Sequence, residues 1–285
     1  MPKRKMKKRR LVGRRELVVM ILAVIFTSAG IKASDMLTGS KTDEHAFSGP
    51  CPPDMVFVNF SSGSFCIDKY EASADGGCPY QSPANQRESR LNLDYGACKP
   101  QSKLSALPWR FISQNQAATA CAKAGKRLPT NSEWLAAAQG TPDKDAGWGA
   151  NDCQVANNWP QQPGASGSGA DCVSSAGAYD LIGNAWEWVE GTVSEGNFKD
   201  KALPDSGYVL SVDDEALPAE TRPDAGDENY YGDYFWIKRK GVRGIARGGY
   251  WDNAKDAGQY AMYVVSEPSF AGTGVGFRCV AEARQ

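Results

Sequence analysis

The stretch YDLIGNAWEWV, residues 179–189, combines two acids, an asparagine and a glycine with two tryptophans, and it ends a long segment without periodicity. The preceding residues 140–179 are rich in glycine, asparagine and aspartate, which is typical of irregular structure that needs an external stabiliser. Large aromatic side chains bury more apolar area than any others and are expected to fill the core beside this stretch. They are Trp134, Trp186, Trp188 and Phe277.

Regular elements are predicted on both sides of this irregular segment. Residues 55–73 alternate apolar and polar side chains about a Ser-Ser-Gly turn, which predicts a hairpin of short strands. Residues 113–139 predict two helices, the first ending at Gly125 and the second capped by Thr130 or Asn131. GVGFRCV near the end predicts a closing strand. Residues 192–245, acidic and then aromatic, are predicted to be a second irregular stretch.

Composition and charge restrict the class of protein. The 285 residues, 41% of them hydrophobic, include 30 glycines, 16 prolines and 8 tryptophans, which indicates a globular protein rich in turns. After residue 33 the chain holds 22 basic and 32 acidic residues, a net charge of −10. Phosphate contacts need clustered lysine and arginine on the folded surface, so nucleic acid is not expected as a partner.

The beginning of the chain carries an export signature. Nine of the 32 lysines and arginines lie in residues 1–15, and a mostly apolar run follows over residues 17–31. As a helix this run would span about 22 Å, less than the roughly 30 Å hydrocarbon core of a bilayer. We therefore expect a signal peptide over residues 1–33, with a retained N-terminal membrane anchor as the alternative. Residues 34–50 are polar and predict a flexible linker.

All eight cysteines follow the predicted signal. An even number of cysteines in an exported domain predicts disulfides rather than metal thiolates, and no C-x-x-C pair is present. Sequence alone permits about 105 pairings. Nearness in the sequence is the only ground for pairing Cys51 with Cys66, Cys78 with Cys98, and Cys153 with Cys172.

Five motifs stand in order along the chain: MVFV with CIDKYEAS, GKRLPTNSEW, YDLIGNAWEWV, RGGYW and GFRC. Together they resemble the formylglycine-generating enzyme (sulfatase-modifying factor) family over residues 51–285, with residues 192–245 as an acidic and aromatic insertion. The resemblance implies the family's compact variant of the C-type lectin fold, a single α+β domain low in regular secondary structure. It also pairs Cys121 with Cys279.

The resemblance further implies one or two structural calcium sites. Ca²⁺ takes six to eight oxygens from carboxylates, amides and backbone carbonyls, which irregular Asn/Asp/Gly loops supply. The alternative is that Asp180 and Asn184 only cap turns while Glu187 is solvated. The residues at the family's first site are Asn157, Asn158, Asp171 and Val173, and those at its second are Asp180, Gly183, Ala185 and Glu187.

The residues that the family's oxidases use to bind copper are missing. In those members two cysteines after the RGG motif bind copper(I), and soft thiolates are what copper(I) requires. Counting onward from Arg247, these cysteines correspond to about Gly258 and Tyr263, so copper is not expected. The family's iron branch needs three histidines, whereas the single histidine, His45, lies in the linker.

Aromatic side chains surround the place where the family has its active groove. We therefore expect a calcium-stabilised binding or structural module of the cell envelope, in the periplasm or at the cell surface. Its partner would be a peptide, a protein or a glycan, and any membrane contact would come from an uncleaved N-terminal segment. The alternative is a divergent tailoring enzyme acting on a peptide, with Asp252, Tyr260 and Tyr263 as candidate catalytic residues. The expected groove residues, which ordinary packing in the core explains nearly as well, are Tyr234, Arg247, Tyr250, Trp251 and Asn253.

Overall fold

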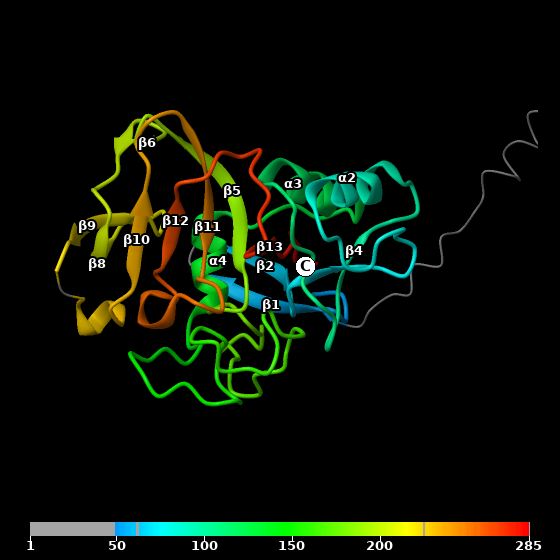
Figure 1. Cartoon of the computed structure of the whole chain (residues 1–285), viewed down its shortest axis with the longest axis horizontal. Helices are drawn as coiled ribbons and strands as arrows, with labels where there is room; N and C mark the ends of the chain where they lie inside the picture. Colours follow the sequence, from blue (N-terminus) through cyan, green and yellow to red (C-terminus); the bar gives the residue numbers. More distant parts are fainter. Residues whose placement is uncertain (1–48, 61–62, 225, 285) are drawn as a thin grey trace, which may run out of the picture. The chain divides into compact units, whose positions relative to one another are not determined.

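A nine-stranded sheet is the largest element of the protein (Figure 1). The computed structural model describes residues 49–60, 63–224 and 226–284, so the predicted signal peptide and nearly all of the predicted linker lie outside the described residues. The strand order is β7-β6-β5-β11-β12-β10-β8-β9, and β13 pairs with β5. The strands are β5 (Trp186–Ser194), β6 (Asn197–Phe198), β7 (Lys201–Ala202), β8 (Gly207–Val212), β9 (Pro218–Arg222), β10 (Tyr234–Ile237), β11 (Val242–Arg247), β12 (Met262–Val264) and β13 (Val275–Phe277).

Two smaller sheets accompany it. The predicted hairpin is confirmed: β1 (Met55–Phe60) pairs antiparallel with β2 (Gly63–Asp68), and β14 (Val280–Glu282) joins the other edge of β2. The closing strand of the sequence is therefore two strands, β13 in the large sheet and β14 in this small one. The third sheet pairs β3 (Ala72–Ala74) with β4 (Pro100–Ser102).

The described residues contain three short helices, of which α3 and α4 contact the sheets and α2 contacts α3. Both predicted helices are present, α3 (Gln114–Lys123) and α4 (Asn131–Ala138), and each begins with a capping box, which satisfies free backbone N–H groups. Thr130 caps α4, one of the two predicted choices. The structure adds α2 (Gln86–Asp94), which lies beside α3 in Figure 1, and two 3₁₀ turns at Glu228–Tyr230 and Ala254–Asp256. No helix among the described residues is long and apolar enough to cross a membrane.

The large sheet separates two apolar clusters, because successive side chains of a strand point to opposite faces. On one face Val189, Phe235 and Ile245 pack with Trp134. On the other face Trp186 and Trp188 pack with Trp109 and Phe277. The four aromatic side chains predicted for the core are all buried, between 0% and 7% exposed.

The second predicted irregular stretch, residues 192–245, is not irregular in the structure. It forms β6 to β10, and Val209, Leu217 and Phe235 bury their side chains in the core. The strands are only two to six residues long, too short for their alternation to stand out among the acidic turns. Residues 139–185, by contrast, contain no helix or strand in this fully described segment, as predicted.

Four disulfides bridge all eight cysteines. The Cys121–Cys279 bridge joins α3 to the residue before β14, across 158 positions of sequence. The other bridges close loops of 15 to 20 residues and are Cys51–Cys66, Cys78–Cys98 and Cys153–Cys172. These are the pairings expected from the family resemblance and from nearness in the sequence.

Candidate functional site

The RGG motif ends strand β11 and brings its backbone close to two other segments. Gly248 and Gly249 both have positive φ, +91° and +90°, a region that other residues rarely adopt. A Cβ atom on Gly248 would lie 2.6 Å from the carbonyl oxygen of Leu181, and one on Gly249 would lie 2.4 Å from the Cβ of Ala257. The glycines are therefore required for packing.

Neither position of the family's copper cysteines is free for a thiolate. A Cβ atom on Gly258 would lie 1.9 Å from the Oδ1 of Asp233, so that carboxylate from the inserted segment occupies the space a cysteine would need. Tyr263 packs on the ring of Trp186, with centroids 5.6 Å apart, and its hydroxyl lies 3.3 Å from the Oγ of Ser266. Because every cysteine is in a disulfide, the protein has no thiol elsewhere to offer copper.

An apolar pocket of about 260 Å³ lies next to Tyr263. We call it the aromatic pocket. Its wall consists of strands β5 and β11, the RGG loop and residues 270–275. The wall residues are Trp186, Trp188, Ala246, Tyr250, Tyr263, Phe270, Gly272, Thr273, Gly274 and Val275.

A row of aromatic rings in edge-to-face and tilted contact leads from this pocket across the sheet to the inserted strands. Neighbouring ring centroids lie 5.6, 5.6, 4.7 and 5.1 Å apart. Strand register explains the row: Tyr234 is opposite Tyr208, and Trp236 is opposite Tyr263, so all four side chains share one face. We call this set the aromatic row: Tyr263, Trp186, Trp236, Tyr234 and Tyr208.

The structure brings together some of the expected groove residues and separates others. Tyr250 lines the pocket, Tyr234 belongs to the row, and Trp251 packs edge-on against Tyr250 with centroids 4.9 Å apart. The Asn253 side chain accepts a hydrogen bond from the Tyr250 N–H and so shapes the turn. Arg247 does not face a groove, because its side chain is fully buried.

Arg247 instead holds the segment behind the pocket. Its guanidinium donates to the Asn131 side chain at 3.0 Å and to the carbonyl oxygens of Ala216 and Gln259. It lies 5.2 Å from the ring centroid of Trp134, within the range of a cation–π contact. Burial lowers the pKa of Arg247 to about 10, which leaves it charged at neutral pH.

Two carboxylates, the half-buried Asp143 and the buried Asp233, hold the segment that follows Gly258. Asp143 accepts from the N–H of Gln259 at 3.2 Å, and Asp233 accepts from the N–H of Tyr260 at 2.6 Å. One oxygen of each carboxylate is buried without a partner. Burial raises the pKa of Asp143 to about 7, and burial together with the Asp143 charge raises the pKa of Asp233 well above its ordinary value.

The Asp143 carboxyl should make stability depend on pH. A carboxyl whose pKa is higher in the folded state keeps its proton there, so its contribution is present below about pH 4 and is lost as pH rises to about 7. Between pH 5 and pH 8 the Asp143→Asn variant, which carries no charge, should lose roughly 3 kcal/mol less of its unfolding free energy than the wild type, because each pH unit below a pKa of about 7 accounts for about 1.4 kcal/mol. Urea unfolding at pH 5 and pH 8, at one calcium concentration, measures the difference, and equal pH slopes would contradict it.

The three candidate catalytic residues do not converge. Asp252 is exposed and accepts a hydrogen bond from the Asn157 side chain. Tyr260 packs against Tyr230, with centroids 4.9 Å apart, and burial raises its pKa, which disfavours a reactive phenolate. Tyr263 belongs to the pocket wall. Asp252 and Tyr263 share Tyr250 as an electrostatic neighbour, whereas Tyr260 packs against the inserted segment.

The first predicted calcium site lies in the loop closed by Cys153–Cys172. The Asn157 amide donates to Asp252 Oδ1 at 2.5 Å, a carboxylate outside the predicted ligand set. The Asn158 side chain accepts two backbone N–H groups of its own turn, which leaves its backbone carbonyl as the predicted ligand. Asp171 is exposed, and Val173 forms an isolated bridge with Tyr179.

The second predicted site contains an ion pair that the sequence did not reveal. Glu187 is 1% exposed, so the alternative in which it is solvated is wrong. Its carboxylate accepts from Arg278 at 2.6 to 2.8 Å and from the indole N–H of Trp134 at 2.7 Å. Asp180 Oδ2 accepts the N–H of Gly167 at 2.5 Å, while its buried Oδ1 has no partner. Burial raises the pKa of Asp180 to about 7.

The remaining predicted ligands of this site are backbone carbonyls in the turn before β5. Gly183 and Ala185 are both buried there. A Cβ atom on Gly183 would lie 2.2 Å from the carbonyl oxygen of Gln154, and its φ is +75°, so only glycine fits this approach. The turn therefore lies directly against residues 154–155.

Glu71 is a buried acid of this region that sequence reasoning missed. Its Oε2 accepts from the hydroxyl of Ser166 at 2.8 Å and from the amide of Asn184 at 2.6 Å, while its Oε1 is buried without a partner. Burial, and then the charges of Asp180 and Glu187, raises the pKa of Glu71 well above its ordinary value. Glu71 begins the run EASA, whose other residues are small and buried. An acid beside such a run was the signal in the sequence that could have indicated a buried carboxylate.

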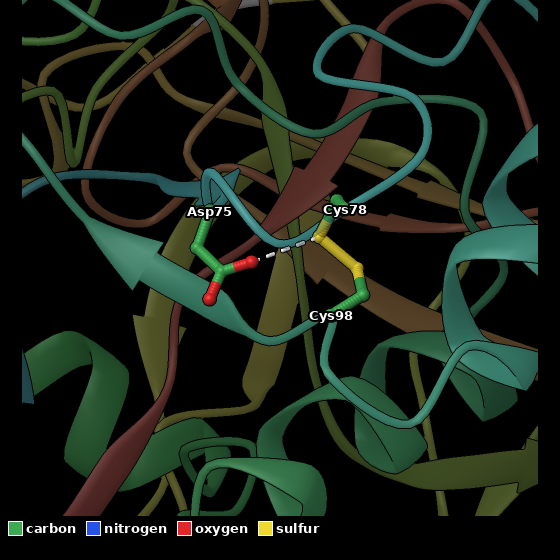
Figure 2. Close-up of side chains that lie close together, drawn as sticks. All are labelled: Asp75, Cys78 and Cys98. Carbon is green, nitrogen blue, oxygen red and sulfur yellow. Dashed lines mark hydrogen bonds between the residues drawn. A yellow bond between two sulfur atoms is a disulfide. The ribbon is translucent and has the colours of Figure 1, made fainter.

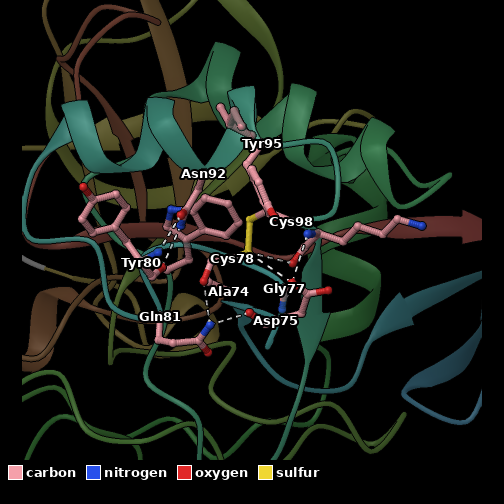
Figure 3. Close-up of a disulfide and its surroundings, with 12 residues drawn as sticks. Ala74, Asp75, Gly77, Cys78, Tyr80, Gln81, Asn92, Tyr95 and Cys98 are labelled. Atoms are coloured by element: carbon pink, nitrogen blue, oxygen red, sulfur yellow. Dashed lines mark hydrogen bonds between the residues drawn. A yellow bond between two sulfur atoms is a disulfide. The ribbon is translucent and has the colours of Figure 1, made fainter.

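A third group resembles a metal site only in composition. Across residues 49–60, 63–224 and 226–284, three cysteine, histidine or acidic ligand atoms come within 4.8 Å of one another only at Asp75, Cys78 and Cys98 (Figure 2). The two sulfurs form a disulfide and carry neither a proton nor a thiolate charge. The Asp75 carboxylate accepts the N–H group of Gly77, which Figure 3 labels beside it. It also accepts the N–H group of Lys99, so it anchors the loop around the disulfide.

Comparison with known proteins finds a family model that matches most of the chain. The family model described as "Sulfatase-modifying factor enzyme 1-like domain" matches residues 36–283. The chain is also 29% identical over 135 residues to a mouse (Mus musculus) protein named "Inactive C-alpha-formylglycine-generating enzyme 2". This similarity covers 39% of the chain and 40% of that relative, so the chain spans about two fifths of its length.

Solved structures show weaker likeness. "Structure of PvdO from Pseudomonas aeruginosa" is matched with a TM-score of 0.39 and 16% identity over 86% of this chain and 89% of that one. "Crystal Structure of CarF" is matched with a TM-score of 0.38 and 16% identity over 81% of this chain and 98% of that one. "Major Tropism Determinant P3c Variant" is matched with a TM-score of 0.43 and 18% identity over 83% and 54% of the two chains.

Proposed function

The chain belongs to the sulfatase-modifying factor enzyme 1-like family, and from that premise we propose that it is an exported, calcium-stabilised binding module without the family's copper-dependent oxidase chemistry. It has the family's α+β variant of the C-type lectin fold, with short strands and, in the part of the chain that the structure describes, three short helices. The ligand we propose is a peptide that places an apolar side chain, aromatic or proline, in the aromatic pocket.

The observation that carries this proposal is the use of the two thiol positions for packing. Gly258 lies against the Asp233 carboxylate, and Tyr263 is part of the pocket wall. A copper(I) site needs two thiolates, and the protein has no free cysteine. The name of the mouse relative, which calls that protein inactive, supports the same conclusion for the matched region.

The shape of the aromatic pocket supports an apolar side chain as its ligand. At about 260 Å³ it is smaller than the usual small-molecule site of roughly 300–1,000 Å³, but it has room for one aromatic side chain. Several of its polar groups are already engaged: Arg110 donates to the hydroxyl of Thr273, Tyr263 is paired with Ser266, and the Trp188 indole donates to the carbonyl oxygen of Ile112. The side-chain groups left for a ligand are the Tyr250 hydroxyl and the Trp186 indole N–H, which are few for the many hydroxyl groups of a sugar.

The aromatic row supports a peptide over a glycan. A sugar ring stacks on a flat, exposed aromatic face, whereas the rings of Tyr208 and Tyr234 meet at 85° and those of Trp236 and Trp186 at 88°. Steeply inclined rings form ridges with grooves between them. Such aromatic-lined grooves accept the successive side chains of proline-rich peptides.

The cysteines support the proposed export, and the buried acids support the proposed calcium stabilisation. Four disulfides are typical of proteins that fold in an oxidising compartment, which fits export to the periplasm or the cell surface. Asp180 has a buried carboxylate oxygen without a donor, and a cation satisfies such an oxygen. Calcium bound there would offset the cost of ordering residues 139–185.

Ligand-observed NMR tests the proposed ligand. Acetyl-tryptophan amide and acetyl-proline amide should bind with dissociation constants on the order of 1 mM, since each offers one side chain, and cellobiose should not bind. Phe270→Ala should abolish the binding signal, because it removes a side chain of the pocket wall. The fold should stay intact, because the Phe270 side chain is 46% exposed. Phe57→Ala is the matched control, because Phe57 is 42% exposed on β1.

Two results would contradict the proposal. Binding of cellobiose without binding of the amides would assign the pocket to a glycan. Aerobic conversion of a cysteine-containing peptide to an aldehyde by the copper-loaded protein would refute the absence of oxidase activity.

A further inference from the structure

Four buried charges meet between the 164–167 segment and strand β5. The acids Glu71, Asp180 and Glu187 are each 1% exposed, and all three interact electrostatically with one fully buried arginine, Arg278. We call these four residues the buried charge cluster. If all are ionised, it carries two negative charges in excess, and buried charge requires a partner.

Glu187 already has its partner. Arg278 donates to both of its oxygens, and the Trp134 indole donates to one of them, so its carboxylate is neutralised and its acceptor positions are filled. Arg278 is also fixed by the carbonyl oxygens of Asp68 and Tyr179. Glu187 therefore cannot turn to a cation without leaving Arg278 unpaired in the core.

The excess charge is thus left on Glu71 and Asp180. Their partnered oxygens bond to adjacent residues: Glu71 to the hydroxyl of Ser166, and Asp180 to the N–H of Gly167. The two carboxylates consequently lie over the same turn of backbone. Each has its second oxygen buried without any donor.

We infer that Glu71 and Asp180 together bind one divalent cation, and that Glu187, the acid which the family's ligand set would supply, serves as the counter-ion of Arg278 instead. This inference rests on the calcium stabilisation proposed above and changes its ligands. Two carboxylates neutralise a divalent ion, and hard oxygen donors in an irregular loop suit Ca²⁺, which tolerates varied geometry better than Mg²⁺ does.

Calcium counting on the full chain tests the inference. After removal of metal with a chelator, the protein is titrated with Ca²⁺ by calorimetry at pH 7.5, and bound calcium is measured by elemental analysis after dialysis. Glu71→Gln and Asp180→Asn should each lose one bound calcium per chain. Asp171→Asn is the matched control, because it removes a carboxylate from the other predicted site and should keep this ion.

A second variant keeps the test decisive if the amide variants do not fold. Glu71→Asp retains the charge but withdraws it by one methylene, and it should weaken calcium binding at this site by about tenfold or more. Full calcium binding by Glu71→Gln would overturn the inference. So would a protonated carboxyl band in the infrared spectrum that persists in saturating calcium and is absent from Glu71→Gln, because protons would then neutralise the pair; the comparison with Glu71→Gln separates this band from those of Asp143 and Asp233.

The aromatic pocket is measured on the same samples. Glu71→Gln should still bind acetyl-tryptophan amide, because neither Glu71 nor Asp180 lines the pocket. Loss of calcium with retained binding of the amide confirms the cation site and leaves the proposed function standing. If the wild type binds calcium but not the amide, the proposed ligand is refuted. If Glu71→Gln also keeps its calcium, the cation site is refuted as well.

Discussion

Replacing Arg278 by Gln should lower the unfolding free energy by about 3–5 kcal/mol, the usual cost of leaving a buried charge without its partner. The substitution leaves the Glu187 carboxylate opposed by no positive charge, with Glu71 and Asp180 nearby. It also removes donors from the carbonyl oxygens of Asp68 and Tyr179. Urea unfolding followed by tryptophan fluorescence measures the loss.

A surface arginine provides the matched control for Arg278. Arg239 pairs with Asp205 at 2.8 Å, but the two side chains are 46% and 87% exposed. Arg239→Gln should therefore cost less than about 1 kcal/mol. Combining Arg278→Met with Glu187→Leu should restore part of the loss, because a hydrophobic replacement removes both buried charges together. An Arg278→Gln variant within 1 kcal/mol of the wild type would contradict a stabilising role for the Arg278–Glu187 pair.

Removing the Cys121–Cys279 bridge should cost about 5 kcal/mol, more than removing any other bridge. In the chain-entropy account, a disulfide restricts the unfolded chain in proportion to the logarithm of the loop it closes, here 158 residues. Both cysteines are fully buried, so alanine is the appropriate replacement at each position. The double variant should unfold at a much lower urea concentration than the wild type.

The Cys78–Cys98 bridge is the comparison, because it closes a loop of only 20 residues. Its double alanine variant should lose about 3 kcal/mol by the same relation. Equal losses for the two bridges would show that local packing, and not loop length, determines their contributions. Both measurements need non-reducing buffer, so that the remaining three bridges stay closed.

Local signals in the sequence predicted the elements that local interactions determine. The capping boxes of α3 and α4 and the alternation of β1 and β2 are each contained within a few residues. The strands of the insertion were missed because β6 to β9 are short hairpin strands among acidic turns, and because β10 pairs with segments that are distant in the sequence, β8 and β12. Tertiary pairing of this kind has no signature in a short window of sequence.

The same difference between local and distant contacts applies to the candidate sites. The motif spacing indicated which residues lie near one another, including Asp180 and Glu187. The motif could not show that Arg278, 91 positions after Glu187, would neutralise it, or that Asp233 would fill the space beside Gly258. Those contacts depend on which segments the fold brings together, and the acids involved look like ordinary surface residues in the sequence.

Residues 275–282 connect four parts of the fold that are far apart in the sequence. β13 pairs with β5, Arg278 neutralises Glu187, Cys279 closes the longest bridge, and β14 completes the sheet of β1 and β2. Without these eight residues a central strand and a buried acid would both lack their partners. The large sheet and the β1–β2 sheet therefore depend on one short segment, which couples the folding of the two sheets.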